Sequence, residues 1–113
     1  MYVFIFAEFA QEPESQAVIF GYNIVLNCAA IKVSDVSPGT LSYSWYHNGN
    51  QLSSSVFSNH SLLIVDIQNG NLGNYSCHVT SQNGNETAIS SPAVLIQACK
   101  KFINLCYYCS IKI

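Results

Sequence analysis

Residues 62–77 read LLIVDIQNGNLGNYSC, and this segment carries more information about the fold than any other. Its first half predicts a strand over 61–67, with three apolar side chains directed into a core: Leu62, Ile64 and Ile67. Its middle, 69–74, contains two glycines and predicts a corner between strands. A further strand is predicted over 75–81, where apolar residues alternate with polar ones. The inward set there is Tyr75, Cys77 and Val79.

Two segments before this one alternate in the same way. Residues 23–28 predict a half-buried strand whose inward face holds Ile24, Leu26 and Cys28. Residues 41–47 predict another, whose inward face holds Tyr43 and Trp45. Asn48-Gly49 follows directly and predicts a tight type I′ hairpin, because both positions of that turn need positive φ. A short return strand is therefore expected near 51–52.

Turn-forming residues separate the remaining segments. Pro13 favours an edge strand with a break, Pro38-Gly39 marks a turn within 34–40, and 82–85 predicts a second hairpin turn. Residues 53–59 predict either a weak strand or a loop, and the last strand ends in the apolar run 93–96. Short strands separated by turns about every ten residues predict an all-β sandwich.

The chain resembles the immunoglobulin superfamily, in its I-set or C2-like branch, over about residues 9–97. The resemblance rests on Cys28, Trp45, Asn48-Gly49 and the pattern Leu62-x-Ile64-x-x-Ile67-x-x-x-Asn71-x-Gly73-x-Tyr75-x-Cys77. It implies an immunoglobulin-like Greek-key β-sandwich of two antiparallel sheets.

The same resemblance implies roles for individual residues. Cys28 and Cys77 are expected to form a disulfide between the sheets, with Trp45 packed on the bridge, and such a bridge belongs to an oxidising compartment. The Tyr75 hydroxyl is expected to bond to upstream backbone at the corner. The family usually has Asp, paired with an Arg, where this chain has Asn71. Since the chain has no Arg, that polar contact is expected to be absent or neutral.

Three parts are expected along the chain: an N-terminal segment over 1–8, the immunoglobulin-like domain over 9–97 and a tail over 98–113. The first ten residues, MYVFIFAEFA, lack a basic start and are interrupted by Glu8, so they are not a convincing signal peptide. No run of about 18 apolar residues predicts a membrane span. The tail follows the last expected strand and is interpreted as a linker or a misannotated terminus.

The tail contains three cysteines, Cys99, Cys106 and Cys109. The spacing Cys106-x-x-Cys109 occurs in zinc and redox sites, but a zinc site normally needs four ligands and no His lies nearby in the sequence. Three interpretations stay open: cysteines without a site, disulfides within or between chains, and a metal or redox site.

The charge balance argues against nucleic acid as a partner. Only 9% of the residues are charged, and residues 1–99 carry one Lys against six acidic residues, a net charge of −5. A surface with this charge does not attract a phosphate backbone.

The sequence does not predict an enzyme. It lacks a Gly-x-Ser-x-Gly elbow and a phosphate-binding glycine loop, and no motif places Asp35 or Asp66 to orient a histidine. His47, His60 and His78 fall at a strand end, in a loop and on an outward strand face. No catalytic, cofactor-binding or metal-binding residue is therefore expected, and no cofactor.

Three Asn-x-Ser/Thr sequences could accept N-linked glycans, and all of them fall in or beside predicted turns. They begin at Asn59, Asn74 and Asn85. Asn and Ser are abundant in this chain, so one or two of these sequences could also be accidental.

A binding surface is the remaining candidate for function. The resemblance implies that the sheet containing the strands of Trp45 and Cys77 often meets partners. We call its outward side the candidate partner face and expect it to consist of Ser44, Tyr46, Ser76, His78 and Thr80. Tyr46 is the expected anchor, because tyrosine brings a large contact area at low entropy cost. The alternative is an ordinary exposed strand tyrosine.

Segments 12–28 and 84–88 are similar to membrane-distal domains of receptor-like pseudokinases and of neural guidance and adhesion receptors. We therefore expect an extracellular protein-binding module in cell adhesion or receptor recognition, within a larger glycosylated cell-surface protein. Its partner would be a protein, bound homophilically or heterophilically, and it would meet a membrane only through the parent chain. The alternatives are a structural spacer without its own ligand and a small secreted or partial product.

Overall fold

The computed structural model describes residues 7–32, 41–53, 57–58, 60–81, 86–98, 100–102 and 105–107. These residues form β-strands and the 3₁₀ helix η2 (Asn69–Asn71). The strands are β1 (Ala7–Gln11), β2 (Gln16–Val18), β3 (Ile24–Asn27), β4 (Ala29–Lys32), β5 (Ser42–His47), β6 (Asn50–Gln51), β7 (Phe57–Ser58), β8 (Ser61–Ile64), β9 (Gly73–Thr80), β10 (Thr87–Ile89), β11 (Ala93–Gln97), β12 (Lys100–Phe102) and β13 (Leu105–Tyr107).

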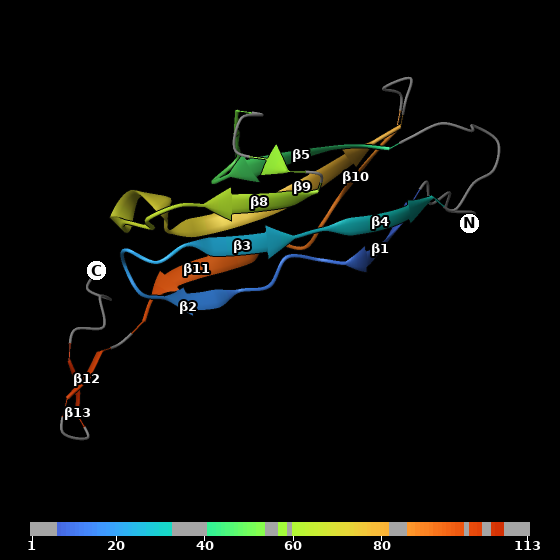
Figure 1. Cartoon of the computed structure of the whole chain (residues 1–113). Coiled ribbons are helices and arrows are strands. Elements are labelled where there is room, and N and C mark those ends of the chain that lie inside the picture. The colour runs from blue at the N-terminus through green and yellow to red at the C-terminus, as the bar shows by residue number, and fades with distance from the viewer. Residues whose placement is uncertain are drawn as a thin grey trace.

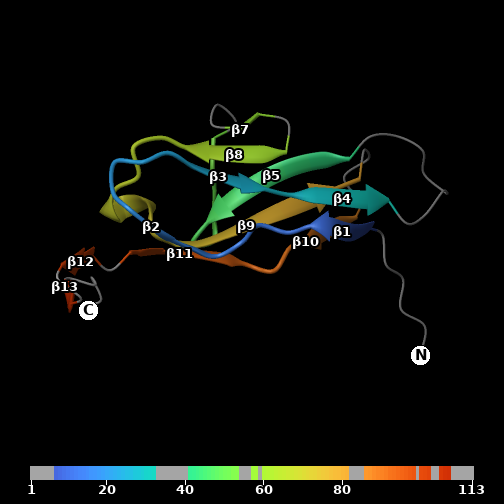
Figure 2. The ribbon, with the colours of Figure 1, turned by 60° about the horizontal axis from the view of Figure 1, so that its bottom comes forward.

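Most of these strands build two layers that face each other (Figure 1). One sheet has the order β2-β11-β9-β5-β6, with β10 also paired to β9, and the other has the order β3-β8-β7. The β1–β4 pair extends the second layer, since β4 continues the line of β3 (Figure 2). The expected Greek-key sandwich is therefore the observed fold. Its described pairs are antiparallel except β2 with β11, which is parallel.

The chain changes from one sheet to the other around Pro13. Before it, β1 pairs with β4, and after it, β2 pairs with β11. Proline suits this position because it has no N–H to contribute to a ladder. β1 begins at Ala7, two residues before the expected domain start at residue 9, because Ala7 is buried and Phe9 also packs on the core.

The core lies between the two sheets and is centred on Trp45, which has no exposed surface. Five of the residues expected there are each at most 8% exposed: Trp45, Tyr75, Leu62, Ile64 and Ile67. Ile24 and Tyr43, also expected to point inward, are only half-buried and pack against this core. The indole N–H of Trp45 is buried and has no acceptor in the described part of the chain. Trp45 therefore contributes to the core through packing and not through a hydrogen bond.

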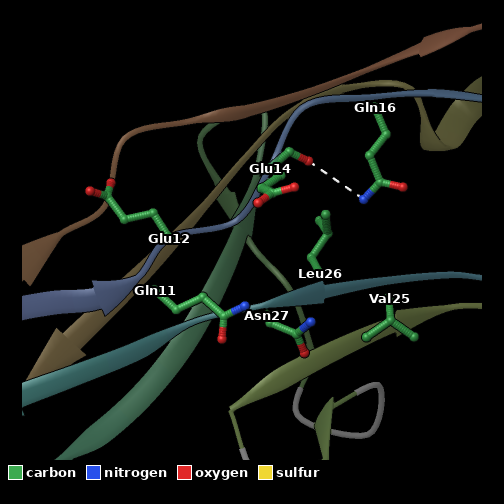
Figure 3. Close-up of a pocket in the computed structure, with 7 residues that line it drawn as sticks. All are labelled: Gln11, Glu12, Glu14, Gln16, Val25, Leu26 and Asn27. Atoms are coloured by element: carbon green, nitrogen blue, oxygen red, sulfur yellow. Dashed lines mark hydrogen bonds between the residues drawn. The ribbon is translucent and has the colours of Figure 1, made fainter.

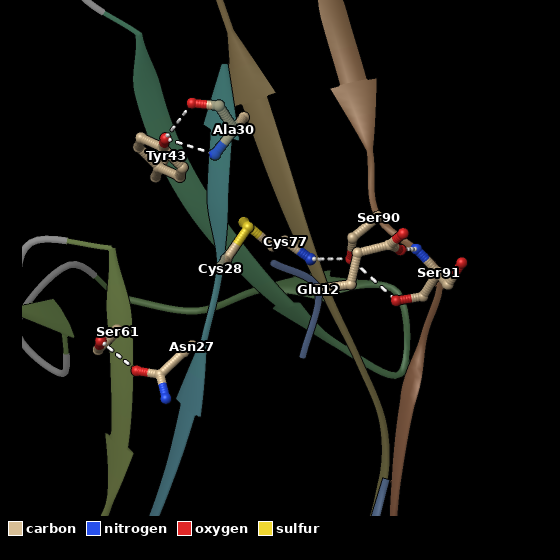
Figure 4. The surroundings of a disulfide bond; sticks show 9 residues. All are labelled: Glu12, Asn27, Cys28, Ala30, Tyr43, Ser61, Cys77, Ser90 and Ser91. Carbon is tan, nitrogen blue, oxygen red and sulfur yellow. Dashed lines mark hydrogen bonds between the residues drawn. A yellow bond between two sulfur atoms is a disulfide. The ribbon is translucent and has the colours of Figure 1, made fainter. Parts of the chain in front are cut away.

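A disulfide joins Cys28 to Cys77, with 6.4 Å between their Cα atoms (Figure 4). Cys28 lies between β3 and β4, and Cys77 lies within β9, so the bridge connects the two sheets. Trp45 stands directly opposite Cys77 on β5. The other side of Cys77 is held by buried Ser90, whose Oγ accepts the Cys77 N–H at 3.0 Å. Ser90 sits where the last expected strand is divided into β10 and β11.

The strand expected over 61–67 is shorter in the structure, because β8 ends at Ile64. Asp66 has φ +54°, which takes the backbone out of the extended conformation. Ile67 is buried nevertheless, because its N–H bonds to the Tyr22 carbonyl at 2.9 Å and its carbonyl accepts the Gly21 N–H at 2.9 Å. The loop before β3 therefore holds Ile67 in the core.

The corner after Ile67 is closed by local hydrogen bonds. The Gln68 N–H donates to Asn71 Oδ1 at 2.7 Å, and the Tyr75 hydroxyl donates to the Asn71 carbonyl at 2.5 Å. The Tyr75 contact is the one that the resemblance implied. The Asn71 side chain thus caps its own corner with an uncharged amide.

The hairpin expected at Asn48-Gly49 is present, with φ values of 51° and 87°. Its return strand, β6, begins at Asn50, one residue earlier than expected. Asn48 also reaches the start of β9, where its N–H donates to the Asn74 carbonyl at 2.8 Å and its Oδ1 accepts the Asn74 N–H at 2.9 Å. Gly73 has φ +121°, and a Cβ there would lie 2.5 Å from Asn48 Oδ1. Only glycine fits this close approach.

The remaining predictions concern two turns, residues 53–59 and the segment that follows β11. The predicted turns at 34–40 and 82–85 lie outside the described residues. Residues 57–58 form the short strand β7, which pairs with β8. Beyond β11, β12 and β13 pair with each other and lie away from the two sheets (Figure 1). The interpretation of 98–113 as a tail remains a prediction.

Candidate functional site

The candidate partner face lies on the two central strands of the larger sheet. Ser44 of β5 stands opposite His78 of β9, and Tyr46 stands opposite Ser76. Thr80 follows at the far end of β9, opposite Ser42. Because alternate residues of a strand point to the same side, the five residues share one surface. All five are half-buried.

The centre of this face is an aromatic stack. The rings of Tyr46 and His78 lie 3.7 Å apart between centroids and are inclined by 18°. The two residues are diagonal neighbours on adjacent strands, which brings large side chains within reach of each other. The Tyr46 hydroxyl also lies 3.5 Å from Gln51 Oε1 on β6. Tyr46 is therefore held in place by its neighbours before any partner arrives.

Burial lowers the pKa of His78 below its ordinary value of 6.5. Desolvation is the cause, because removing water penalises the charged imidazolium. At neutral pH the ring is therefore uncharged, and it presents a flat, neutral surface beside Tyr46.

Acidification from about pH 7.5 to about pH 5 is expected to destabilise the chain through His78. The unfolded chain binds this proton more readily than the folded chain, so the stability is present above the unfolded pKa near 6.5 and is lost as the pH falls below it. The free energy of unfolding, measured with denaturant, should fall less over this range in His78→Gln than in the native chain. Ser76→Ala, on the same face without a titratable group, should keep the native pH dependence. An equal fall in both variants would contradict this role of His78.

Apolar residues that sequence reasoning missed border the face. Ile89 of β10 stands opposite His78 and is 61% exposed, and Val94 of β11 stands opposite Asn74. Ile96 follows on the same side of β11. Alternation along each strand could assign these side chains to an outward face. Which residues are neighbours across the sheet depends on the register between strands, and the pattern within a single strand does not predict that register.

The five residues of the face are uncharged, and so are the bordering residues Gln51, Ile89 and Val94. A charged partner gains no complementary charge here. The arrangement suits a partner that buries aromatic and aliphatic surface, with hydroxyl and amide groups at the rim.

The acceptor sequence at Asn74 also belongs to this face. Asn74 is exposed, and it is two residues before Ser76 on β9, so it points to the same side. Asn59 and Asn85 lie outside the described residues, so their use stays a prediction.

Two hollows elsewhere carry no evident chemistry. One, of about 110 Å³, lies where the chain changes sheets and is lined by Glu12, Glu14 and neighbours on β3 (Figure 3). Glu12 is already engaged, because its Oε1 accepts the Ser91 N–H at 2.6 Å. The other, of about 460 Å³, opens beside β8, where core side chains such as Leu62 and Tyr75 and exposed ones such as Val65 line it.

The remaining histidines of the described chain have structural contacts. His47 stacks on Tyr75 at 4.3 Å and bonds through Nε2 to the Leu72 carbonyl at 2.8 Å, and His60 lies against Tyr43 at 4.6 Å. Among the described residues, no three His, Cys, Asp or Glu side chains gather as metal ligands. None of the helices in that part of the chain is long and apolar enough to cross a membrane.

Known proteins resemble this chain in sequence. The sequence profile of the immunoglobulin domain matches residues 8–81. Protein sidekick-1 of Homo sapiens is 33% identical over 89 residues, which is 74% of this chain and 4% of that protein. Tyrosine-protein kinase-like otk of Drosophila mojavensis is 32% identical over 92 residues, which is 79% of this chain and 8% of that protein. The chain thus spans less than a tenth of either relative.

Solved structures share the architecture. The immunoglobulin domains 1–5 of Sidekick-1 superpose with a TM-score of 0.65 at 25% identity, covering 83% of this chain and 20% of theirs. The tandem immunoglobulin repeats of Dlar superpose with a TM-score of 0.67 at 21% identity, covering 80% and 46%. At 21% identity, the similarity to Dlar shows a shared fold and nothing about function.

Proposed function

Because the chain belongs to the immunoglobulin domain family, we propose that it is an extracellular protein-binding module in cell adhesion or receptor recognition. In this proposal it docks a protein through the candidate partner face and forms part of a larger cell-surface protein. Fold alone does not assign a function, so the argument rests on the face itself.

The stack of Tyr46 on His78 is the observation that carries this proposal. A partner gains most from aromatic side chains that are already ordered, because little conformational entropy remains to be lost on binding. Here the stack is central, uncharged and bordered by exposed Ile89 and Val94. Exposed apolar surface with a polar rim is typical of protein interaction sites.

An extracellular location agrees with two observations. The Cys28–Cys77 disulfide needs an oxidising compartment to persist. The tyrosine-protein kinase-like otk of Drosophila mojavensis is a relative by sequence, and the solved structure of Drosophila OTK consists of extracellular domains. We carry that extracellular location to this chain as part of the proposal.

A structural spacer is the second candidate function. It is favoured by one observation, the acceptor sequence at Asn74, because a glycan there occupies part of the same surface. In a spacer the face would meet no partner, and its residues would affect neither adhesion nor recognition.

Beads coated with the chain test this proposal. Bead–bead aggregation reports a homophilic partner, and binding of the beads to a panel of cultured cells reports a heterophilic one. We expect at least one of the two. Binding in neither assay, with correctly folded chain on the beads, would favour the spacer.

Tyr46→Ala is expected to weaken that binding at least about tenfold, because loss of an aromatic anchor costs more than about 1.4 kcal/mol. Its melting temperature should stay close to that of the native chain, since Tyr46 lies outside the core. Val65→Ala is the matched control: Val65 is 62% exposed and follows the last residue of β8 in the other sheet. Unchanged affinity in Tyr46→Ala would remove Tyr46 as the anchor.

A further inference from the structure

Asn74 has a fixed position at the surface of the larger sheet. Its backbone N–H and carbonyl are both bonded to Asn48, at 2.9 and 2.8 Å. Its side chain is exposed, whereas that of the next residue, Tyr75, is buried, with 2% of its surface exposed. The strand therefore turns the Asn74 amide outward while it anchors Tyr75 inward, and the hydroxyl of Ser76 follows on the outer side.

The surroundings of Asn74 are apolar and nearly without charge. Val94 stands directly opposite Asn74, and Ile96 follows on the same side of β11, with exposed fractions of 38% and 57%. Only 9% of the residues of the chain are charged. A bulky hydrophilic group at Asn74 would cover exposed aliphatic surface that nothing else in the described chain covers.

We infer that Asn74 carries an N-linked glycan and that this glycan borders the candidate partner face at its Tyr46 end. In the transfer, Nδ2 of Asn74 attacks the anomeric carbon of an oligosaccharide carried on a polyprenyl diphosphate. The new C–N bond forms as the bond between that carbon and the phosphate oxygen breaks. The lipid diphosphate leaves with the electron pair, and a proton of the amide is lost. No oxidation takes place.

The position of the glycan follows from the spacing of β9. A strand rises about 3.4 Å per residue, so Ser76 lies roughly 7 Å from Asn74 and His78 roughly 14 Å. Tyr46 stands opposite Ser76, so the first sugars lie beside Tyr46, while His78, Thr80 and Ile89 lie beyond them. A partner therefore approaches from the Thr80 and Ile89 end. This last step rests on the proposed function, whereas the glycan and its position do not.

Occupancy is measured on the full chain, secreted from mammalian cells behind a heterologous signal peptide. Peptide N-glycosidase in heavy-oxygen water converts a glycosylated Asn to labelled Asp, which mass spectrometry finds at residue 74 if the inference holds. In the double variant Asn59→Gln/Asn85→Gln, Asn74 is the remaining acceptor, and one glycan should still be added. Ser76→Ala in that background should abolish it, and Ser76→Thr, which keeps the acceptor sequence, should retain it. Unlabelled Asn74 in folded, secreted chain would overturn the inference.

Chemical modification of the secreted chain tests whether the glycan lies beside Tyr46. Nitration of Tyr46 should speed up several-fold when the glycan is removed by the glycosidase or by Asn74→Gln. Tyr22 is the control, since it is exposed on the loop before β3 and should react equally in all forms. Modification of His78 by diethylpyrocarbonate should change little. Equal nitration of Tyr46 with and without the glycan would contradict the inference that the glycan lies beside Tyr46.

The two proposals fail in different ways. Beads carrying glycosylated chain and beads carrying Asn74→Gln chain enter the same aggregation and cell-binding assays. If neither binds, the proposed docking function fails while the occupancy result stands. If Asn74 is unoccupied and the beads bind, the glycan fails while the docking function stands.

Discussion

Unfolding of the double variant Cys28→Ala/Cys77→Ala should require about 4 kcal/mol less free energy than unfolding of the native chain. The bridge closes a loop with a sequence separation of 49 residues, and in the chain-entropy model a loop of this size restricts the unfolded state by about that amount. Domains of this size are stable by about 5–15 kcal/mol in total. The variant is therefore expected to lose at least about a quarter of its stability, and equilibrium denaturation followed by circular dichroism measures the difference.

The control for this experiment removes the other cysteines. Cys99, Cys106 and Cys109, replaced together by Ser, should change the free energy of unfolding by less than about 0.5 kcal/mol, because the sequence predicts that 98–113 is a tail beyond the domain. In the native chain, with all five cysteines present, peptide mapping without reduction should recover Cys28 joined to Cys77. Recovery of Cys77 joined to a tail cysteine would contradict the core bridge, and so would a double variant as stable as the native chain.

Trp45→Ala should lower the free energy of unfolding by about 3–5 kcal/mol. Removing a fully buried Trp forfeits its transfer free energy and leaves a cavity that the two sheets cannot close. The lost volume lies directly opposite Cys77, so the packing around the disulfide is disturbed as well. Because Trp45 is the single Trp of the chain, unfolding must be followed by circular dichroism and not by Trp fluorescence.

Trp45→Phe separates packing from hydrogen bonding. It removes a buried indole N–H that has no acceptor among the described residues. A buried unsatisfied donor destabilises the folded state by about 1–3 kcal/mol, so its removal offsets part of the lost packing. The Phe variant should therefore be clearly more stable than the Ala variant. A loss below about 1 kcal/mol in Trp45→Ala would mean that the indole does not fill the core.

The core could be predicted from the sequence because it follows from alternation along single strands. Leu26, Tyr75 and Val79 each occupy an inward position of a period-two pattern, and each is buried. The hairpin at Asn48-Gly49 was equally predictable, since few residues other than Asn and Gly adopt positive φ readily. In these places local chemistry and global fold require the same residue type.

Features that depend on two distant segments were not predictable in this way. The end of β8 depends on Asp66, whose N–H bonds to Asn23 Oδ1 at 3.0 Å from 43 residues away. The stack of Tyr46 on His78 depends on the register between β5 and β9. The sequence predicted that both rings point outward, but their contact is a property of the assembled sheet.

The contact between Gly73 and Asn48 limits which inherited changes this chain can tolerate. Every replacement of glycine adds a Cβ, and at position 73 that atom would collide with Asn48 Oδ1 and require an unfavourable φ. A missense change there therefore disturbs the turn between β5 and β6, although the two positions are 25 residues apart. Asn48, by contrast, can lose its side chain and still leave room for Gly73. We therefore expect position 73 to tolerate almost no substitution, whereas position 48 should tolerate some.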